Sequence, residues 1–324
     1  MQMALVQRRR ILVALLIGGA ATIIVLCYRI YVGEPSGDLF YPLCAAQALM
    51  QGDDPYGERC FIYDQEQFYP ANPLTTTLAV YPFLLVLGNK VLVSALLPGI
   101  ASGLLAYGIT DRGQWWRLMV FASGVYWLCL RRSQWGILIA AIAMLPALLP
   151  LTLIKPHIGL PLVLTRATPR RIAACAAFVL VSLLIMPDWP MRYLRHGNLD
   201  TYTGFIPLLT LPLGPLLALS AVLIWKGRRS QRLWDLALYS LVPQRSLYDL
   251  AVLWTIPTTP AGMAALTVCS WLPLFAGPII APFVGPVTYP TLVVGCVYLP
   301  LLIAVFLERH LAVRREKRSL QAAT

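Results

Sequence analysis

The sequence predicts an all-α polytopic membrane protein, and its composition and its charge-free runs are the observations behind that prediction. The chain has 324 residues, of which 58% are hydrophobic and 12% are charged, and its mean hydropathy is +0.69. Soluble domains carry about 25% charged residues, so a water-soluble enzyme, a disordered chain and a disulfide-built secreted module are excluded. A bilayer-spanning helix needs about 20 residues without charge. Runs without Asp, Glu, Lys or Arg cover 11–28, 67–89, 91–110, 133–154, 201–225 and 250–307.

The formal net charge of +12 indicates topology rather than nucleic-acid recognition, because the basic residues cluster at the ends of apolar runs. The positive-inside rule places such clusters in cytoplasmic loops and tails. Both termini, including a basic tail at about 309–324, are therefore expected in the cytoplasm, and no nucleic-acid partner is expected. The clusters are Arg8–Arg10, Arg166 with Arg170 and Arg171, Lys226 with Arg228, Arg229 and Arg232, and Arg314, Arg315, Lys317 and Arg318.

Acidic residues gather in one segment near the N-terminus. Seven of the 14 Asp and Glu residues lie between positions 34 and 66, where Arg59 is the only cation, so this segment has a formal charge of −6. The first helix, at about 11–31, carries the segment to the outer face and is expected to stay as an anchor, since no small-residue cleavage site precedes the loop. We therefore expect an acidic outer loop at about 32–72 in a multi-pass protein of the bacterial plasma membrane.

Within this outer loop, residues 39–50 predict a short amphipathic helix that lies in the membrane interface. Turn-forming residues at 52–56 end that helix. Cysteine usage predicts no metal centre, because the seven cysteines show no Cys-x-x-Cys motif and no His/Cys ligand spacing. Only Cys44 and Cys60 share the outer loop and could form a disulfide.

The remaining chain predicts a bundle of 8–12 transmembrane helices in a single integral membrane domain, 1–324. Four prolines between 146 and 161 interrupt the stretch 110–165, which predicts a broken or re-entrant segment. An outer loop is expected at about 188–205. If Asp249 lies outside, the block 250–307 crosses the membrane three times, in steps of about 19 residues. Further spans are expected at 73–88, 89–109, 171–187 and 206–225.

Asp38 is the first candidate for chemistry. It lies a few residues beyond the first helix, at the outer edge of the bilayer, where a lipid-borne substrate presents its headgroup. A partly desolvated carboxylate in that position can act as general base for an acceptor hydroxyl. The alternative is that Asp38 is the N-cap of the interfacial helix, a role that suits aspartate well.

Lys155 is the second candidate. A lysine within an apolar, proline-broken segment is costly in lipid, so it is expected to face a cavity and to mark a functional site. Its compact ammonium group suits a phosphate. The alternative is that the side chain snorkels to the membrane interface.

Short motifs occur in an ordered set from about 37 to 250. They are Asp38, Gly52-Asp-Asp-Pro-Tyr56, Phe68-Tyr-Pro-Ala-Asn-Pro73, Arg132-Ser-Gln-Trp-Gly136, Leu153-Ile-Lys-Pro-His157 and Leu241-Val-Pro-Gln-Arg-Ser-Leu-Tyr-Asp249. The set resembles the integral-membrane glycosyltransferases of the GT-C superfamily, in particular glycosyltransferase family 87, the polyprenyl-phosphate-mannose-dependent α-mannosyltransferases and their relatives. This chain has Ser133 where that family has a glycine before Gln134, and Gly136 where it has an asparagine.

The resemblance implies a GT-C-like helical bundle with Asp38 as catalytic base and Lys155 on the donor's lipid phosphate. His157 would contact the same phosphate or have an ordinary polar role. Arg245 would bind phosphate while Tyr248 or Asp249 binds sugar hydroxyls, or Arg245 and Asp249 would simply bridge at a helix end. The remaining expected substrate contacts are Gln134 of the fourth motif and Tyr56, Tyr69 and Trp135, aromatic residues that would stack on sugar or prenyl groups or else belong to an aromatic belt.

The expected reaction is inverting transfer of mannose, or of another hexose or pentose, from a polyprenyl-phosphate donor to a lipid or glycan acceptor at the outer face. Lys155 or Arg245 would stabilise the departing phosphate. No cofactor is expected, because phosphate is already a good leaving group, although the loop acids could hold a divalent cation. The alternative is a non-enzymatic membrane protein, such as a transporter of lipids or small molecules, in which Lys155 and the broken helices line a pathway.

Overall fold

The computed structural model describes residues 2–34, 36–57, 72–196, 204–225, 230–275, 288–308 and 310, and these ranges are helical. They contain no β-strand, only an isolated antiparallel bridge between Phe205 and Gln244. The chain forms two compact units, the first comprising 1–113 and 128–203 and the second 114–127 and 204–324. The all-α fold is confirmed within the described ranges, whereas the expected single membrane domain stays a prediction.

The first unit contains most of the residues singled out from the sequence. After residues 114–127, which belong to the second unit, the chain returns to the first unit within α5 (Gly124–Arg132). Two 3-10 helices, η1 (Gly37–Leu39) and η5 (Pro146–Ile154), precede α2 and α7. The other helices of this unit are α1 (Gln2–Val32), α2 (Phe40–Met50), α3 (Leu74–Leu87), α4 (Lys90–Ile109), α6 (Gly136–Met144), α7 (Pro156–Arg166), α8 (Pro169–Ile185) and α9 (Trp189–His196).

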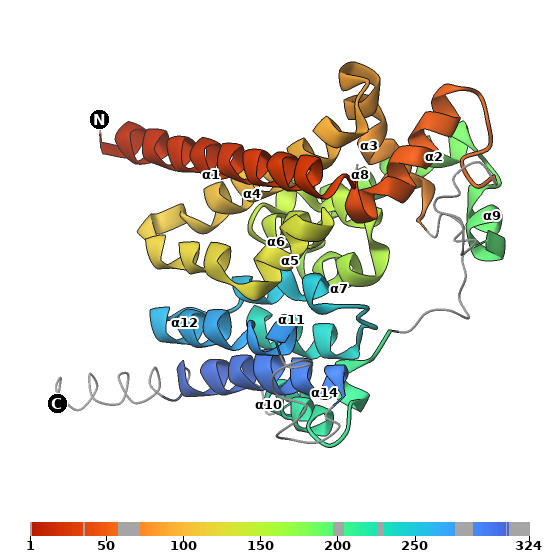
Figure 1. The fold of residues 1–324 in the computed structure, drawn as a ribbon. Helices are drawn as coiled ribbons and strands as arrows, with labels where there is room; N and C mark the ends of the chain where they lie inside the picture. The colour runs from red at the N-terminus through yellow and green to blue at the C-terminus, as the bar shows by residue number, and fades with distance from the viewer. Residues whose placement is uncertain are drawn as a thin grey trace, which may run out of the picture. The chain divides into compact units, whose positions relative to one another are not determined.

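The long helices α1 and α4 pack against each other in antiparallel orientation (Figure 1). Tyr107, near the end of α4, meets the start of α1: Gln7 Nε2 donates to its hydroxyl at 2.7 Å and Arg10 Nη2 to its carbonyl at 2.9 Å. Glycines allow the close approach, since a Cβ added to Gly18 would lie 2.9 Å from the carbonyl oxygen of Gly99. Membrane helices commonly associate through such small-residue contacts.

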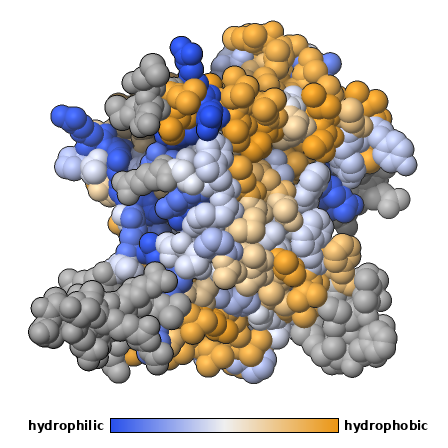
Figure 2. Space-filling model, turned by 90° about the vertical axis from the view of Figure 1, so that its left-hand side faces the viewer, coloured by the Kyte–Doolittle hydropathy of each residue, from blue (hydrophilic) through white to orange (hydrophobic). Residues whose placement is uncertain are grey.

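Apolar surface and helix length are compatible with a membrane protein. Among the described residues, three helices are long and apolar enough to cross a membrane, or four if α8 and α9, bent by 84°, are one span. Leu15 and Ile30 of α1 are 68% and 70% exposed, and apolar residues form a broad area at the upper right of the face shown in Figure 2, beside hydrophilic areas on its left. Soluble proteins rarely expose apolar patches of that extent. The three spans are Leu5–Val32, Lys90–Ile109 and Tyr289–Glu308.

Residues 73–88 do not form the membrane crossing expected for them. They form α3, which has 14 residues and is shorter than a crossing requires. Figure 1 shows α3 near the C-terminal end of α1, standing across that helix rather than along it. The chain then continues into α4, which starts at the same end of α1. The predicted crossing at 73–88 was therefore wrong, while the one at 89–109 matches α4.

The helix expected at 39–50 exists as α2, but it is not amphipathic. Most of its side chains pack into the unit, and Gln47 and Met50 are exposed. Its buried residues are Pro42, Leu43, Ala45, Ala46 and Ala48. The alternation of apolar and polar residues in the sequence was too weak to define one solvent face, so the amphipathic interpretation was wrong.

The predicted break within 110–165 is confirmed. Helix α6 ends at Met144, Pro146 starts the 3-10 helix η5, and Pro156 starts α7. Proline lacks a backbone N–H and fits best at the first turn of a helix, so each of these two prolines begins a new segment. The outer loop expected at 188–205 contains α9.

The second unit is built from shorter helical segments. The span expected at 206–225 is interrupted, since 3-10 turns precede α10. Glu308, at the end of the final helical stretch, accepts the backbone N–H groups of Thr258 at 3.1 Å and Thr259 at 3.0 Å, which ties that stretch to the start of α12. The main segments are η4 (Trp115–Ala122), α10 (Ala218–Trp225), α11 (Gln231–Leu241), η9 (Leu247–Thr255), α12 (Pro260–Cys269) and α14 (Tyr289–Val293).

Candidate functional site

Asp38, Gln134 and Lys155 form one hydrogen-bonded series within the first unit. The Gln134 side-chain amide donates through Nε2 to Asp38 Oδ2 in a short contact. Its Oε1 accepts from Lys155 Nζ at 3.2 Å. Arg132 adds a looser ion pair, with Nη1 3.9 Å from Asp38 Oδ1. Residues that are 21 to 117 positions apart in the chain thus place a carboxylate, an amide and an ammonium group side by side.

Asp38 does not have the capping role that the sequence left open for it. It is the second residue of η1, and the N-cap position of α2 is Leu39, which makes no side-chain capping hydrogen bond. Its carboxylate is turned toward Gln134 instead and is 34% exposed. The N-cap alternative was therefore wrong.

Lys155 is held by the backbone on both sides. Its own N–H donates to the carbonyl of Thr152 at 3.1 Å, and its carbonyl accepts from Gly159 at 2.9 Å at the start of α7. From α3, Thr75 Oγ1 donates to the Leu153 carbonyl at 2.7 Å and Thr76 Oγ1 to the Ile154 carbonyl at 2.6 Å. These bonds fix the segment between η5 and α7, from which the Lys155 ammonium reaches Gln134.

The turn that carries Gln134 depends on a residue that the sequence argument missed. The Arg29 side chain is fully buried, and its Nη2 donates to the Arg131 carbonyl at 2.6 Å and to Ser133 Oγ at 3.0 Å. Its Nη1 pairs with Glu34 Oε2 at 3.1 Å. An arginine inside an otherwise apolar helix is costly in a membrane and is by default functional, which is the signal that could have found it.

Ser133 itself has a left-handed backbone, with φ of +50°. Such a conformation costs a non-glycine residue about 1–3 kcal/mol and persists only where the surroundings enforce it. Here the Ser133 hydroxyl accepts from Arg29 and donates to the Ser94 carbonyl at 3.1 Å. These two hydrogen bonds hold the strained turn between α5 and α6 and so set the position of Gln134.

Burial dominates the electrostatics of Asp38. Desolvation raises the pKa of its carboxyl above the ordinary aspartate value, although the Gln134 hydrogen bond and the charges of Arg132 and Lys155 lower it in part. A raised pKa makes a carboxylate a stronger base, which favours removal of a proton from a hydroxyl.

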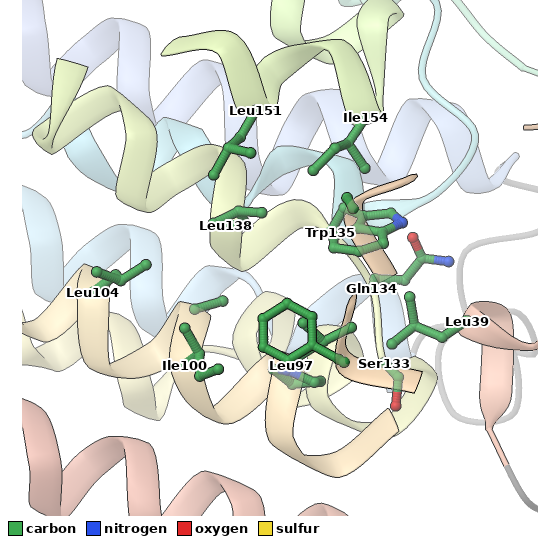
Figure 3. Close-up of a pocket in the computed structure, with 14 residues that line it drawn as sticks. Leu39, Leu97, Ile100, Leu104, Ser133, Gln134, Trp135, Leu138, Leu151 and Ile154 are labelled. Atoms are coloured by element: carbon green, nitrogen blue, oxygen red, sulfur yellow. The ribbon is translucent and has the colours of Figure 1, made fainter. Parts of the chain in front are cut away.

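An apolar cavity of about 130 Å³ ends at Gln134. In Figure 3 the Gln134 amide lies beside Leu39 and Trp135 at one end of the cavity, and Leu104 of α4 lies at the other. Leu97 and Ile100 of α4 line the stretch between them. Gln134 therefore joins the polar series to one end of a hydrocarbon-lined recess, while Asp38 and Lys155 are not among the residues that line it.

The remaining expected site residues are distributed differently. Tyr56 is buried, and its hydroxyl donates to the Asn72 carbonyl at 3.3 Å, while the stacking expected for it stays a prediction. Burial raises the pKa of its phenol, which stays protonated. His157 lies half-buried in the first turn of α7, two residues after Lys155. Tyr69 lies outside the described residues.

Arg245, Tyr248 and Asp249 belong to the second unit. Asp249 is fully buried in η9, and its Oδ2 accepts the backbone N–H of Arg245 at 3.0 Å. The acid thus fixes the start of η9 through the main chain. The sugar and phosphate contacts expected for these three residues stay predictions.

Two observations concern metals and disulfides. In the part of the chain that the structure describes, no group of three or more His, Cys, Asp or Glu side chains is arranged to hold a metal ion. Cys44, in α2, is disulfide-bonded. Cys60, the partner expected from the sequence, lies outside the described residues.

Comparisons of the chain with protein-family models, with curated proteins and with solved structures found no match.

Proposed function

We propose that this protein is a membrane glycosyltransferase that moves a sugar from a polyprenyl-phosphate donor to a lipid or glycan acceptor at the outer face of the plasma membrane. The observation that carries the proposal is the series Asp38–Gln134–Lys155, whose middle residue lines one end of an apolar cavity. A base, a cation and a hydrocarbon-lined recess correspond to the acceptor hydroxyl, the donor phosphate and the prenyl chain.

In this reaction Asp38 takes the proton of the acceptor hydroxyl as the oxygen attacks the anomeric carbon. The bond from that carbon to the phosphate oxygen breaks, and the electron pair leaves with the lipid phosphate. Lys155 neutralises the negative charge that develops there. Attack from the face opposite the leaving phosphate inverts the configuration of the carbon.

Gln134 couples the two charged groups. Its amide N–H holds the Asp38 carboxylate and its carbonyl holds the Lys155 ammonium, so one side chain sets the spacing between base and cation. A misplacement of about 1 Å in such a site can lower a rate about 100-fold. Gln134 is therefore proposed as the residue that positions Asp38 and Lys155.

Two further observations support the proposal. The left-handed backbone at Ser133 is one that favours glycine, and glycine is the residue that the glycosyltransferase motif has at this place. The disulfide at Cys44 is expected of an oxidising, extracytoplasmic compartment, which agrees with an outer position for the loop that carries Asp38.

The cavity would take the part of the prenyl chain nearest the phosphate. Its volume of about 130 Å³ is close to the roughly 150 Å³ of a cavity that binds benzene, so it accommodates about one isoprene unit. The rest of a long prenyl chain would lie in the surrounding lipid.

The test is sugar transfer by the purified chain with prenyl-phosphate mannose as the first donor. We expect Asp38→Asn to lower turnover by about 10²- to 10⁴-fold, because an amide cannot accept the proton. Asp111→Asn is the matched control: Asp111 is 56% exposed, pairs with Arg10 at 3.0 Å, and should tolerate the change. Equal turnover in the wild type and Asp38→Asn would refute the catalytic role.

The affinity for the sugar donor tests the role proposed for Lys155. Lys155→Ala should weaken binding of the donor about tenfold or more, the size of a lost charge-assisted contact. Lys155→Arg should retain part of the affinity, since it keeps the charge but changes its shape. If the alanine variant binds the donor as tightly as the wild type does, Lys155 does not contact the phosphate, and the transporter alternative regains support.

A further inference from the structure

A second cavity lies in the first unit, where the C-terminal end of α2 faces the turn between α3 and α4. Its volume is about 600 Å³, and it shares no lining residue with the cavity that ends at Gln134. Gln47 and Gln51 line it from the α2 side, and Asn89 and Lys90 line it from the turn. This corner has no part in the chemistry proposed for Asp38.

The polar lining of this corner cavity consists of three side-chain amides and one positive charge. Among the described residues, no carboxylate lines it. The Lys90 ammonium lies 5.5 Å from the centroid of the Phe40 ring, a cation–π distance that restricts the position of the charge. Asn89 Oδ1 accepts the backbone N–H of Leu92 at 3.1 Å, so the amide is anchored through its oxygen and its NH₂ group is the part that can donate. Ammonium and amide N–H groups together suit phosphate oxygens.

Apolar residues that follow the lining residue Leu84 in the chain are exposed. Val86, in the last turn of α3, is 81% exposed, and Leu85 beside it is 57% exposed. Met50, which lines the cavity from α2, is 40% exposed. In water such side chains would be unfavourable, whereas in the interface of a membrane they enter the acyl region.

The position of Lys90 relative to the membrane follows from α4. Lys90 is the first residue of this 20-residue candidate span, and Val86 lies four positions before it. A lysine at the end of a span directs its ammonium to the headgroup layer. The N-terminal end of α4 adds the positive end of its dipole at the same place.

We propose that the corner cavity binds the phosphate of an anionic membrane lipid. Lys90 and the amides of Gln47, Gln51 and Asn89 contact the phosphate oxygens, while Val86 and Leu85 lie among the acyl chains. The bound lipid would fix the α3–α4 turn in the headgroup layer. This site is independent of the glycosyltransferase proposal, so either can fail without the other.

The experiment measures saturable binding of short-chain phosphatidylglycerol to the full-length chain in detergent by native mass spectrometry. Lys90→Gln removes the charge and should weaken binding about tenfold. The double variant Gln47→Ala with Gln51→Ala should weaken it by a smaller factor. Arg170→Gln is the matched control, because it removes one exposed positive charge at the start of α8 and should leave binding unchanged. Thermal unfolding of each lipid-free variant shows whether it is folded.

Two further ligands in the binding experiment test whether the bound phosphate belongs to a lipid. Short-chain phosphatidylcholine should bind more weakly, since its headgroup has no net charge, and inorganic phosphate should fail to displace phosphatidylglycerol because it lacks acyl chains. Equal phosphatidylglycerol binding by the wild type, Lys90→Gln and the double variant would overturn the proposal. Displacement by inorganic phosphate at the same concentration as the lipid would overturn the lipid assignment.

Discussion

The contact between α1 and α4 allows a sharp test, because α1 contains two adjacent glycines with different surroundings. A Cβ added to Gly18 would lie 2.9 Å from the Gly99 carbonyl oxygen and 3.4 Å from the Gly103 Cα. A Cβ added to Gly19 would meet no atom within 4 Å. Gly18→Ala and Gly19→Ala are therefore chemically identical changes, and only the first disturbs the packing of the two helices.

The expected magnitude follows from this geometry. The atom that blocks the new methyl group at Gly18 is a backbone oxygen, which cannot rotate away, so the helices must separate. A separation of 0.5–1 Å removes about a quarter to a half of the dispersion energy at each contact. Overpacking of this kind costs about 1–3 kcal/mol. Both variants gain up to about 1 kcal/mol of helix propensity from alanine, so the difference between them isolates the packing cost.

Thermal unfolding in detergent, followed by the fluorescence of the nine tryptophans, is a suitable assay. One kcal/mol corresponds to roughly 2–4 °C in the unfolding midpoint of a chain of this size class. Gly18→Ala should therefore unfold several degrees below Gly19→Ala, and Gly19→Ala at or above the wild-type temperature. If Gly18→Ala unfolds at the same temperature as Gly19→Ala or higher, the close glycine contact between α1 and α4 is wrong.

Four further predictions concern the site and its topology. Burial raises the pKa of Asp38. The rate of sugar transfer should therefore increase with pH, with a midpoint above the usual aspartate pKa of about 4. A pH–rate profile that is flat down to pH 4 would contradict this. The raised pKa also means that the folded state binds the Asp38 proton more tightly than the unfolded state does. The free energy of unfolding of the wild type therefore falls as pH rises through the folded-state pKa of Asp38. Asp38→Asn lacks this titration, so its stability relative to the wild type should be higher at pH 7 than at pH 4. Arg29→Gln should lower the free energy of unfolding by about 1–3 kcal/mol, because it removes the Arg29 donors to the Arg131–Ser133 turn; unchanged unfolding in denaturant would show that the turn does not need Arg29. Asp64→Cys should react with a membrane-impermeant thiol reagent in intact cells, and labelling only after permeabilisation would reverse the predicted topology.

The sequence by itself was sufficient for the all-α class, the helices α1 and α4, the break between α6 and α7, and Asp38 and Lys155 as candidates. Each depends on local information: hydropathy over about 20 residues, a proline in the chain, or a charge in apolar surroundings. Gln134 came from the motif resemblance, and its contact with both charged residues was visible only in the structure.

Tertiary structure alone decided where α3 goes and what holds the site. An apolar run of 14 residues has the same hydropathy whether it crosses a membrane or lies across a neighbouring helix. The hydropathy of α3 therefore does not tell at which end of α1 the next helix, α4, begins. The link from Arg29 through Ser133 to Ser94 joins three elements over as many as 104 positions. Such contacts form only when distant segments pack, which is why the support of Gln134 could not be derived from local patterns, whereas the long apolar helices α1 and α4 could.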